Sequence, residues 1–137
     1  MSRSTKLVSA AYIMSYIAAK DPQQLTTDSI ADAVKDHPAR VRQIVAALVK
    51  AELLNSLRGA GGGVVLARPP EKISMKDIYL AVDEQPLLSI GLRAGFDGWD
   101  NACTVRPVLT TLYAEMESDL VEKLAKVKLT ALYKKTR

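Results

Sequence analysis

Cationic, amide and small side chains recur along one side of the segment that begins at Pro38, and they suit contact with nucleic acid. At about 100° per residue, one side of a helix here would carry Ala39, Gln43, Ala46 and Lys50, with Arg40 and Arg42 on its flanks. An amide can pair with an adenine edge while cations meet phosphates, as on a recognition helix in a major groove. Because solvated helix faces are also charged, the inference depends on the neighbouring elements.

The elements around this face predict a helix-turn-helix. The apolar residues of the segment lie at the i, i+3, i+4, i+7 spacing of a core-facing stripe: Val41, Ile44, Val45 and Leu48. Before it, Thr26-Thr27-Asp28 supplies caps for a short helix through Val34. Asp36 or His37 stands at the boundary of the second helix, and Pro38 fits its first turn. As the only histidine, His37 is interpreted as a solvated turn residue that can approach phosphate.

Two short apolar runs then flank a glycine-rich turn, which predicts a β-hairpin. Leu53 to Arg58 forms the first run, 59–63 the turn, and Val64 to Ala67 the second. A phosphate-binding nucleotide loop is the alternative, but the turn lacks the Lys-Ser/Thr pair of a P-loop and no helix follows. We therefore expect a wing, with Arg58, Gly59 and Gly61 against a minor groove.

The same stretch resembles a known family. The sequence reads Ala51-Glu52-Leu53-Leu54, then Arg58 to Gly63, Leu66 to Glu71 and Ile73 to Ile78 in the order seen in the Rrf-two family of bacterial transcription regulators, which includes the IscR, NsrR and CymR types. The resemblance implies a mainly α fold with a small β-hairpin wing: a winged helix-turn-helix plus a long C-terminal dimerisation helix. Gln43 matches the family's usual glutamine, whereas Arg42 replaces a common acidic residue, so the operator should differ.

The resemblance also implies a sensor loop, and there the chain departs from the cluster-binding members. Those members place three cysteines in this loop, of which only Cys103 has a match, whereas Gly91 and Asp97 stand at the other two places. Because an iron-sulfur cluster normally needs four ligands, we expect the cluster-free branch, with no cofactor and no metal. Cys103 is either a redox or thiol sensor activated by Arg106 and the following helix, or a cysteine without a role.

A long helix is predicted from Val105 to about Leu132. Its apolar seam comprises Val105, Val108, Leu109, Leu112, Met116, Leu120, Leu124 and Val127. A helix of about 40 Å exceeds what a domain of this size needs to cover its core. We expect a homodimer in which the partner covers this seam, together with Tyr12 and Tyr16 of the first helix; folding back over its own domain is the alternative.

Composition bounds the remaining possibilities. The 137 residues are 48% hydrophobic, with no apolar run long enough to span a membrane and no signal-peptide pattern, so we expect a cytoplasmic protein without membrane contact. Residues 1–70 hold nine Lys and Arg against five Asp and Glu, whereas residues 71–137 hold ten of each. The expected division is a winged-helix DNA-binding domain at 1–83, a sensor-type loop at 84–104, and a dimerisation helix with a tail at 105–137.

These observations predict a homodimeric regulator, a repressor, that binds a double-stranded DNA operator. Contacts would come from His37, Arg40, Arg42, Gln43, Lys50 and the wing. A winged-helix module that regulates a protein partner without its own operator is the alternative. One histidine, one cysteine and no paired carboxylates leave no catalytic constellation, so we do not expect an enzyme. Operator sequence and effector stay unknown.

Overall fold

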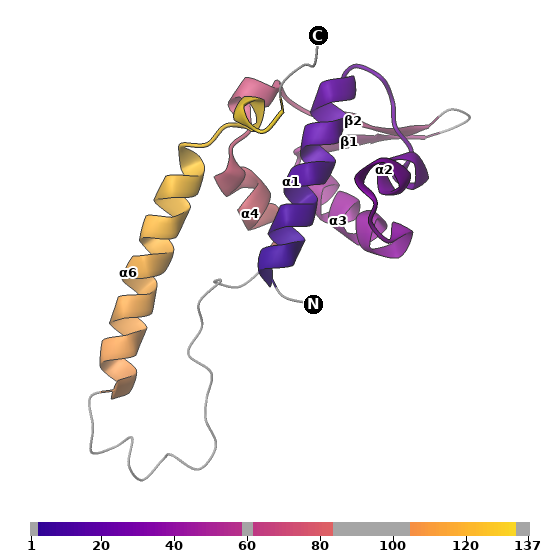
Figure 1. Ribbon diagram of the computed structural model, residues 1–137. Helices are drawn as coiled ribbons and strands as arrows, with labels where there is room; N and C mark the ends of the chain where they lie inside the picture. Colours follow the sequence, from indigo (N-terminus) through magenta and orange to yellow (C-terminus); the bar gives the residue numbers. More distant parts are fainter. Residues whose placement is uncertain (1–2, 59–61, 84–104, 134–137) are drawn as a thin grey trace.

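The computed structural model describes residues 3–58, 62–83 and 105–133 (Figure 1). The elements follow in the order α1 (Arg3–Lys20), α2 (Thr27–Val34), α3 (Pro38–Lys50), β1 (Leu54–Leu57), β2 (Gly63–Leu66), η1 (Pro70–Lys72), α4 (Met75–Val82), α6 (Val105–Ala125) and η2 (Leu129–Ala131). Helices α1 to α4 and the hairpin form one body, from which α6 extends to one side (Figure 1). This confirms the predicted mainly α fold with a two-stranded wing.

Helix α1 lies at the centre of the core. Ala10, Ile13, Met14 and Ile17 recur at helical spacing and are completely buried. The predicted stripe of α3 is confirmed, because Val41, Ile44, Val45 and Leu48 all belong to the same buried cluster. Packing against α1 and α2 therefore fixes which side of α3 faces solvent.

The hairpin is joined to the helix-turn-helix by backbone hydrogen bonds. Strands β1 and β2 are antiparallel, with Leu54 opposite Leu66 and Leu57 opposite Gly63. The N–H of Val64 donates to the Leu25 carbonyl at 2.8 Å, and the Leu25 N–H donates to the Val64 carbonyl at 3.2 Å. Leu25 directly precedes the cap of α2, so this bridge sets the position of the hairpin relative to the helices.

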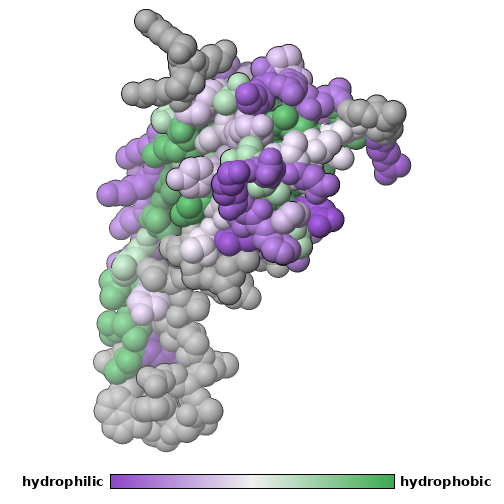
Figure 2. Space-filling view, turned by 45° about the vertical axis from the view of Figure 1, so that its right-hand side comes forward, coloured by the Kyte–Doolittle hydropathy of each residue, from purple (hydrophilic) through white to green (hydrophobic). Residues whose placement is uncertain are grey.

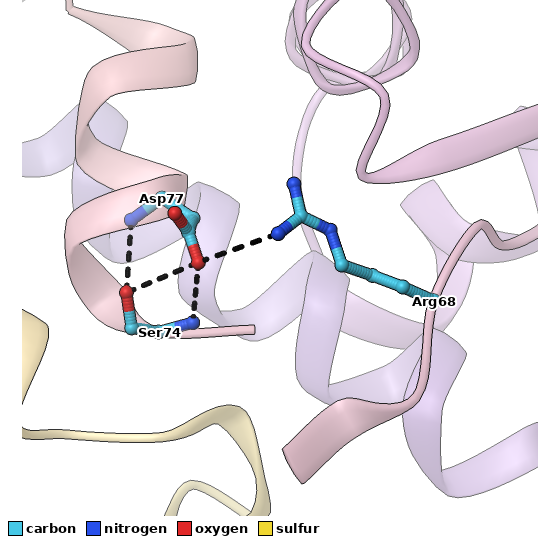
Figure 3. A network of polar contacts seen from close by, with 3 residues as sticks. All are labelled: Arg68, Ser74 and Asp77. Atoms are coloured by element: carbon cyan, nitrogen blue, oxygen red, sulfur yellow. Dashed lines mark hydrogen bonds and ion pairs between the residues drawn. The ribbon is translucent and has the colours of Figure 1, made fainter. Parts of the chain in front are cut away.

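Helix α4 begins at a capping box formed by Ser74 and Asp77 (Figure 3). The Asp77 N–H donates to the Ser74 hydroxyl oxygen at 3.2 Å, and the Ser74 N–H donates to the Asp77 carboxylate at 2.9 Å. Arg68, from the segment after β2, lies 3.9 Å from the same carboxylate. These contacts satisfy backbone donors at the helix start and hold α4 beside the end of the hairpin.

The prediction that the last helix continues to Leu132 is wrong. Helix α6 ends at Ala125, and its 21 residues span about 32 Å rather than 40 Å. The chain then turns back, because the Met75 N–H donates to the Val127 carbonyl and the Leu129 N–H donates to the Ile73 carbonyl, both at 2.8 Å. Leu129 is completely buried in the core that α1 organises.

Helix α6 is only partly covered. It packs on α4, while its lower part in Figure 1 runs beyond the other helices. Not one of its 21 residues is buried. In the described part of the chain, no helix combines the length and the apolar character needed to cross a bilayer.

Candidate nucleic-acid interface

The outward side of α3 carries the residues that the sequence predicts for DNA contact. Ala39, Arg42, Gln43, Ala46 and Lys50 are all exposed. The apolar stripe on the opposite side of α3 is buried in the core, which fixes the orientation of these exposed residues. An amide and two cations are therefore presented on one rigid helix, a position from which base edges and phosphates can be reached together.

The start of α3 is fixed by local polar contacts. His37 is the N-cap residue, and its Nδ1 accepts a hydrogen bond from the Ala39 N–H at 3.2 Å. A ring that accepts at Nδ1 carries its proton at Nε2, so the free edge of the exposed imidazole is a donor. Of the two residues that the sequence places at this helix boundary, Asp36 and His37, the histidine is thus the cap, and it is also a surface residue.

Arg40 lies closer to the protein than its neighbours on α3. Its Nε is 3.8 Å from an Asp36 carboxylate oxygen, and only 21% of its side chain is exposed. Burial raises the pKa of Asp36, but hydrogen bonds from His37 and Ser9 and the charge of Arg40 outweigh it, so the pKa lies below its ordinary value. Arg40 therefore connects the turn to α3 in this structure, and its predicted groove contact stays untested.

Arg42 and the hairpin stand on either side of a groove. The Arg42 Nε donates to the Pro38 carbonyl at 3.3 Å, which uses one of its five donors. Arg58 follows β1 directly and is exposed. A groove of about 530 Å³ separates α3 from the strands. Gly59 and Gly61, the other predicted wing residues, lie outside the described residues.

Apolar side chains line the outer side of α6. The exposed fractions are 49% for Val105, 58% for Val108, and 44% for both Leu112 and Met116. Figure 2 shows hydrophobic side chains, in green, along the lower part of this helix. Of the other predicted seam residues, Leu109, Leu120 and Leu124 are half-buried, and Val127, which lies after the end of α6, is 38% exposed.

The two tyrosines of α1, Tyr12 and Tyr16, lie in different surroundings. Tyr12 is 66% exposed, whereas Tyr16 packs against the core. An apolar cavity of about 320 Å³ lies beside Tyr12, between α1, Met75 and Leu132. Tyr12 is thus available to a partner, and Tyr16 also serves the fold of its own chain.

A polar contact that no sequence pattern indicates links α4 to α6. The hydroxyl of Tyr79, a residue only 2% exposed, donates to the Glu117 carboxylate at 2.6 Å. The two residues are 38 positions apart, and nothing in either local pattern indicates the pair. This bond is a polar contact in the joint between the winged body and the long helix.

The predicted sensor loop, residues 84–104, lies outside the described residues. Cys103 lies outside the described residues, and Arg106 stands half-buried in the first turn of α6. Within the described ranges, no three His, Cys, Asp or Glu side chains gather as metal ligands. One cysteine and one histidine in the whole chain do not fit thiolate ligation of a cluster.

A recognition-type helix beside a β-hairpin, with a long helix extending from the body, defines the class of winged-helix transcription regulators. The sequence profile of one family in this class, Rrf2, described as "Iron-dependent Transcriptional regulator", matches residues 3–135. The chain belongs to the Rrf2 family, as its resemblance to the Rrf-two regulators predicts. It is therefore a transcriptional regulator and not an enzyme.

Relatives and solved structures agree with this assignment. YffB of Lactococcus lactis, assigned by name to the HTH-type transcriptional regulators, is 32% identical over 125 residues, which cover 88% of this chain and 80% of that protein. The oxidized form of Staphylococcus aureus CymR is 28% identical with a TM-score of 0.69 and covers 99% of this chain and 100% of CymR. IscR of T. potens is 25% identical with a TM-score of 0.65, over 91% and 80% of the two chains.

Proposed function

We propose that the protein is a homodimeric repressor that binds a specific DNA operator through two winged helices. The observation that carries this proposal is the exposed face of α3, with Arg42, Gln43 and Lys50, beside a hairpin whose first strand is followed by the exposed Arg58. A dimer would present two such faces to half-sites about one helical turn apart. A repressor of this kind acts by occupying the promoter.

The predicted residues divide between base recognition and contact with the sugar-phosphate backbone in this proposal. Gln43 pairs with a base edge in the major groove, while His37 and Lys50 stay near phosphates. Arg58 brings the wing to the backbone or the adjacent minor groove. Arg40, held by Asp36, contributes its charge near the turn rather than a direct base contact unless that ion pair opens.

The exposed seam of α6 supports the dimer. Val108, Leu112 and Met116 leave contiguous apolar surface in contact with solvent in a single chain. Covering such a strip with the same strip of a second copy gives a two-fold interface. The half-buried Leu109 and Leu120 lie along the margin of that contact.

Binding to DNA can be tested with one selection and two variants. A random duplex pool enriched on the protein should yield a near-palindromic site. In Gln43→Ala, discrimination at one base pair per half-site should fall by about 1–3 kcal/mol. In Arg58→Ala, every duplex should bind more weakly, and the salt slope should fall by about one unit. Lys20→Ala, on an exposed position at the end of α1, is the matched control for loss of charge.

Two outcomes would contradict this proposal. A pool that shows no enrichment would remove sequence-specific binding and favour the protein-interaction alternative. An Arg58→Ala variant with unchanged affinity and salt slope would remove the wing from the contact.

Thiol sensing through Cys103 belongs to the same proposal. A solved relative, CymR of S. aureus, is known in an oxidized form. Operator affinity should change on mild oxidation of this protein, and Cys103→Ser should abolish that response. An unchanged response in the variant would assign Cys103 no role. The absence of an iron-sulfur cluster stays a prediction, which iron and acid-labile sulfide content would test.

A further inference from the structure

The groove between α3 and the hairpin is lined by both polar and apolar side chains. Its volume is about 530 Å³, and it is bordered by the end of the loop before α2, by α3 and by both strands. If α3 enters a major groove and the hairpin tip reaches the neighbouring minor groove, the sugar-phosphate strand between those grooves must pass through this space. The groove is therefore the part of the surface where duplex backbone and protein come closest.

Polar groups from three separate elements line the groove. Thr27 stands at the first turn of α2, Ser56 lies exposed on β1, and Arg42 belongs to α3. Each carries a hydrogen-bond donor that a phosphate oxygen accepts, and the guanidinium adds positive charge. Among the described residues that line the groove, none is a carboxylate.

Apart from Thr26 and the glycines, the rest of the lining is apolar. Val45 and Val49 of α3 and Leu57 of β1 belong to it, and Leu57 is 37% exposed. An apolar floor suits the carbon atoms of deoxyribose but offers nothing to base edges, which need paired donors and acceptors. Hydroxyls and a cation above such a floor match an alternating chain of sugars and phosphates.

We propose that one sugar-phosphate strand of the operator lies in this groove, with its phosphates bound by Arg42, Thr27 and Ser56. Arg42 then positions the duplex and reads no base, so Gln43 carries the base recognition on this side of α3. This inference rests on the proposed function, since it requires DNA binding. It adds a contact surface that joins the recognition helix to the wing.

The test uses the full-length protein and the duplex selected from the random pool. Each phosphate in turn is replaced by an uncharged methylphosphonate, and affinity is measured for the wild type, Arg42→Met and Thr27→Val. In the wild type, substitution at one or two neighbouring phosphates per half-site should weaken binding about tenfold. The same methylphosphonate substitutions should lower the DNA affinity of Arg42→Met and Thr27→Val by at most about twofold, because these variants already lack the contact to that phosphate.

Lys20→Met is the matched control, because Lys20 is an exposed cation at the end of α1, outside the groove lining and outside the proposed DNA contacts. It should keep the full methylphosphonate effect at the phosphates assigned to Arg42. Two results would overturn the inference: an unchanged methylphosphonate pattern in Arg42→Met, or a changed base preference in that variant. Both differ from failure of the proposed function, in which the pool yields no bound duplex.

Discussion

Gly63 shows how one residue holds the hairpin against the helices. A methyl group at this position would lie 2.5 Å from the Leu25 carbonyl oxygen and 2.8 Å from its carbon. Both atoms are backbone, and the two hydrogen bonds between Leu25 and Val64 prevent them from moving aside. The close approach of the two segments therefore depends on a residue without a Cβ atom.

Gly63→Ala should accordingly destabilise the protein by about 1–3 kcal/mol, as overpacking does elsewhere. Denaturant unfolding at one protein concentration measures the change. Ser56→Ala, which removes an exposed hydroxyl on the opposing strand, should change stability by less than about 0.5 kcal/mol. Equal stability of Gly63→Ala and the wild type would show that the loop before α2 can retreat from the hairpin.

At the scale of the elements, the contact between α4 and α6 invites a direct measurement. Tyr79→Phe removes the hydroxyl that donates to Glu117 and leaves a half-buried carboxylate without that donor. The free energy of unfolding should fall by about 1–3 kcal/mol. In a double-mutant cycle with Glu117→Ala, which removes the acceptor, the two losses should not add.

Tyr12→Phe is the control for this loss, since it removes a hydroxyl from a ring that is 66% exposed. It should leave stability nearly unchanged. Additive losses for Tyr79→Phe and Glu117→Ala would mean that the two side chains contribute to stability independently of each other.

The elements also show how far the sequence could predict this molecule. Local rules predict the stripe of α3, the Thr26 cap and the Ser74–Asp77 box, because each depends on neighbours within four positions. The end of α6 is different. Apolar spacing continues through Val127, but backbone pairing with Ile73 and Met75, far away in the sequence, ends the helix at Ala125.

The candidate site divides in the same way. The outward side of α3 follows from helical period alone, so Gln43 and Lys50 could be predicted to face solvent. The groove needs Thr27, Arg42 and Ser56 to come together from three elements, and no spacing in the chain indicates that arrangement. The sequence predicts Arg40 among the residues of α3 that contact DNA, but in the structure its side chain pairs with Asp36 and is largely buried.

On the scale of the whole molecule, the seam of α6 should determine the oligomeric state. Leu112→Asp or Met116→Asp would place an unpaired charge where a second copy covers apolar surface. Sedimentation velocity at micromolar concentration should show a dimer for the wild type and monomer or aggregate for either variant. Operator affinity should fall along with the dimer, because one winged helix holds only a half-site.

Ser118→Asp introduces the same charge at an exposed position of α6 away from Leu112 and Met116, and it should leave the dimer intact. A wild-type protein that sediments as a stable monomer would remove the second copy from the proposed function. The exposed strip would then call for a different partner.

The return of the chain after α6 bears on how this protein could be taken apart and reused. Leu129 lies in the core and its N–H donates to the Ile73 carbonyl, while the Val127 carbonyl accepts from the N–H of Met75, the first residue of α4. A gene fusion that transplanted only residues up to the end of α4 would lose a fully buried leucine, at a cost of about 2–5 kcal/mol for the side chain alone. A stable isolated winged-helix domain would therefore also need residues 127–131, connected by circular permutation or added as a separate segment.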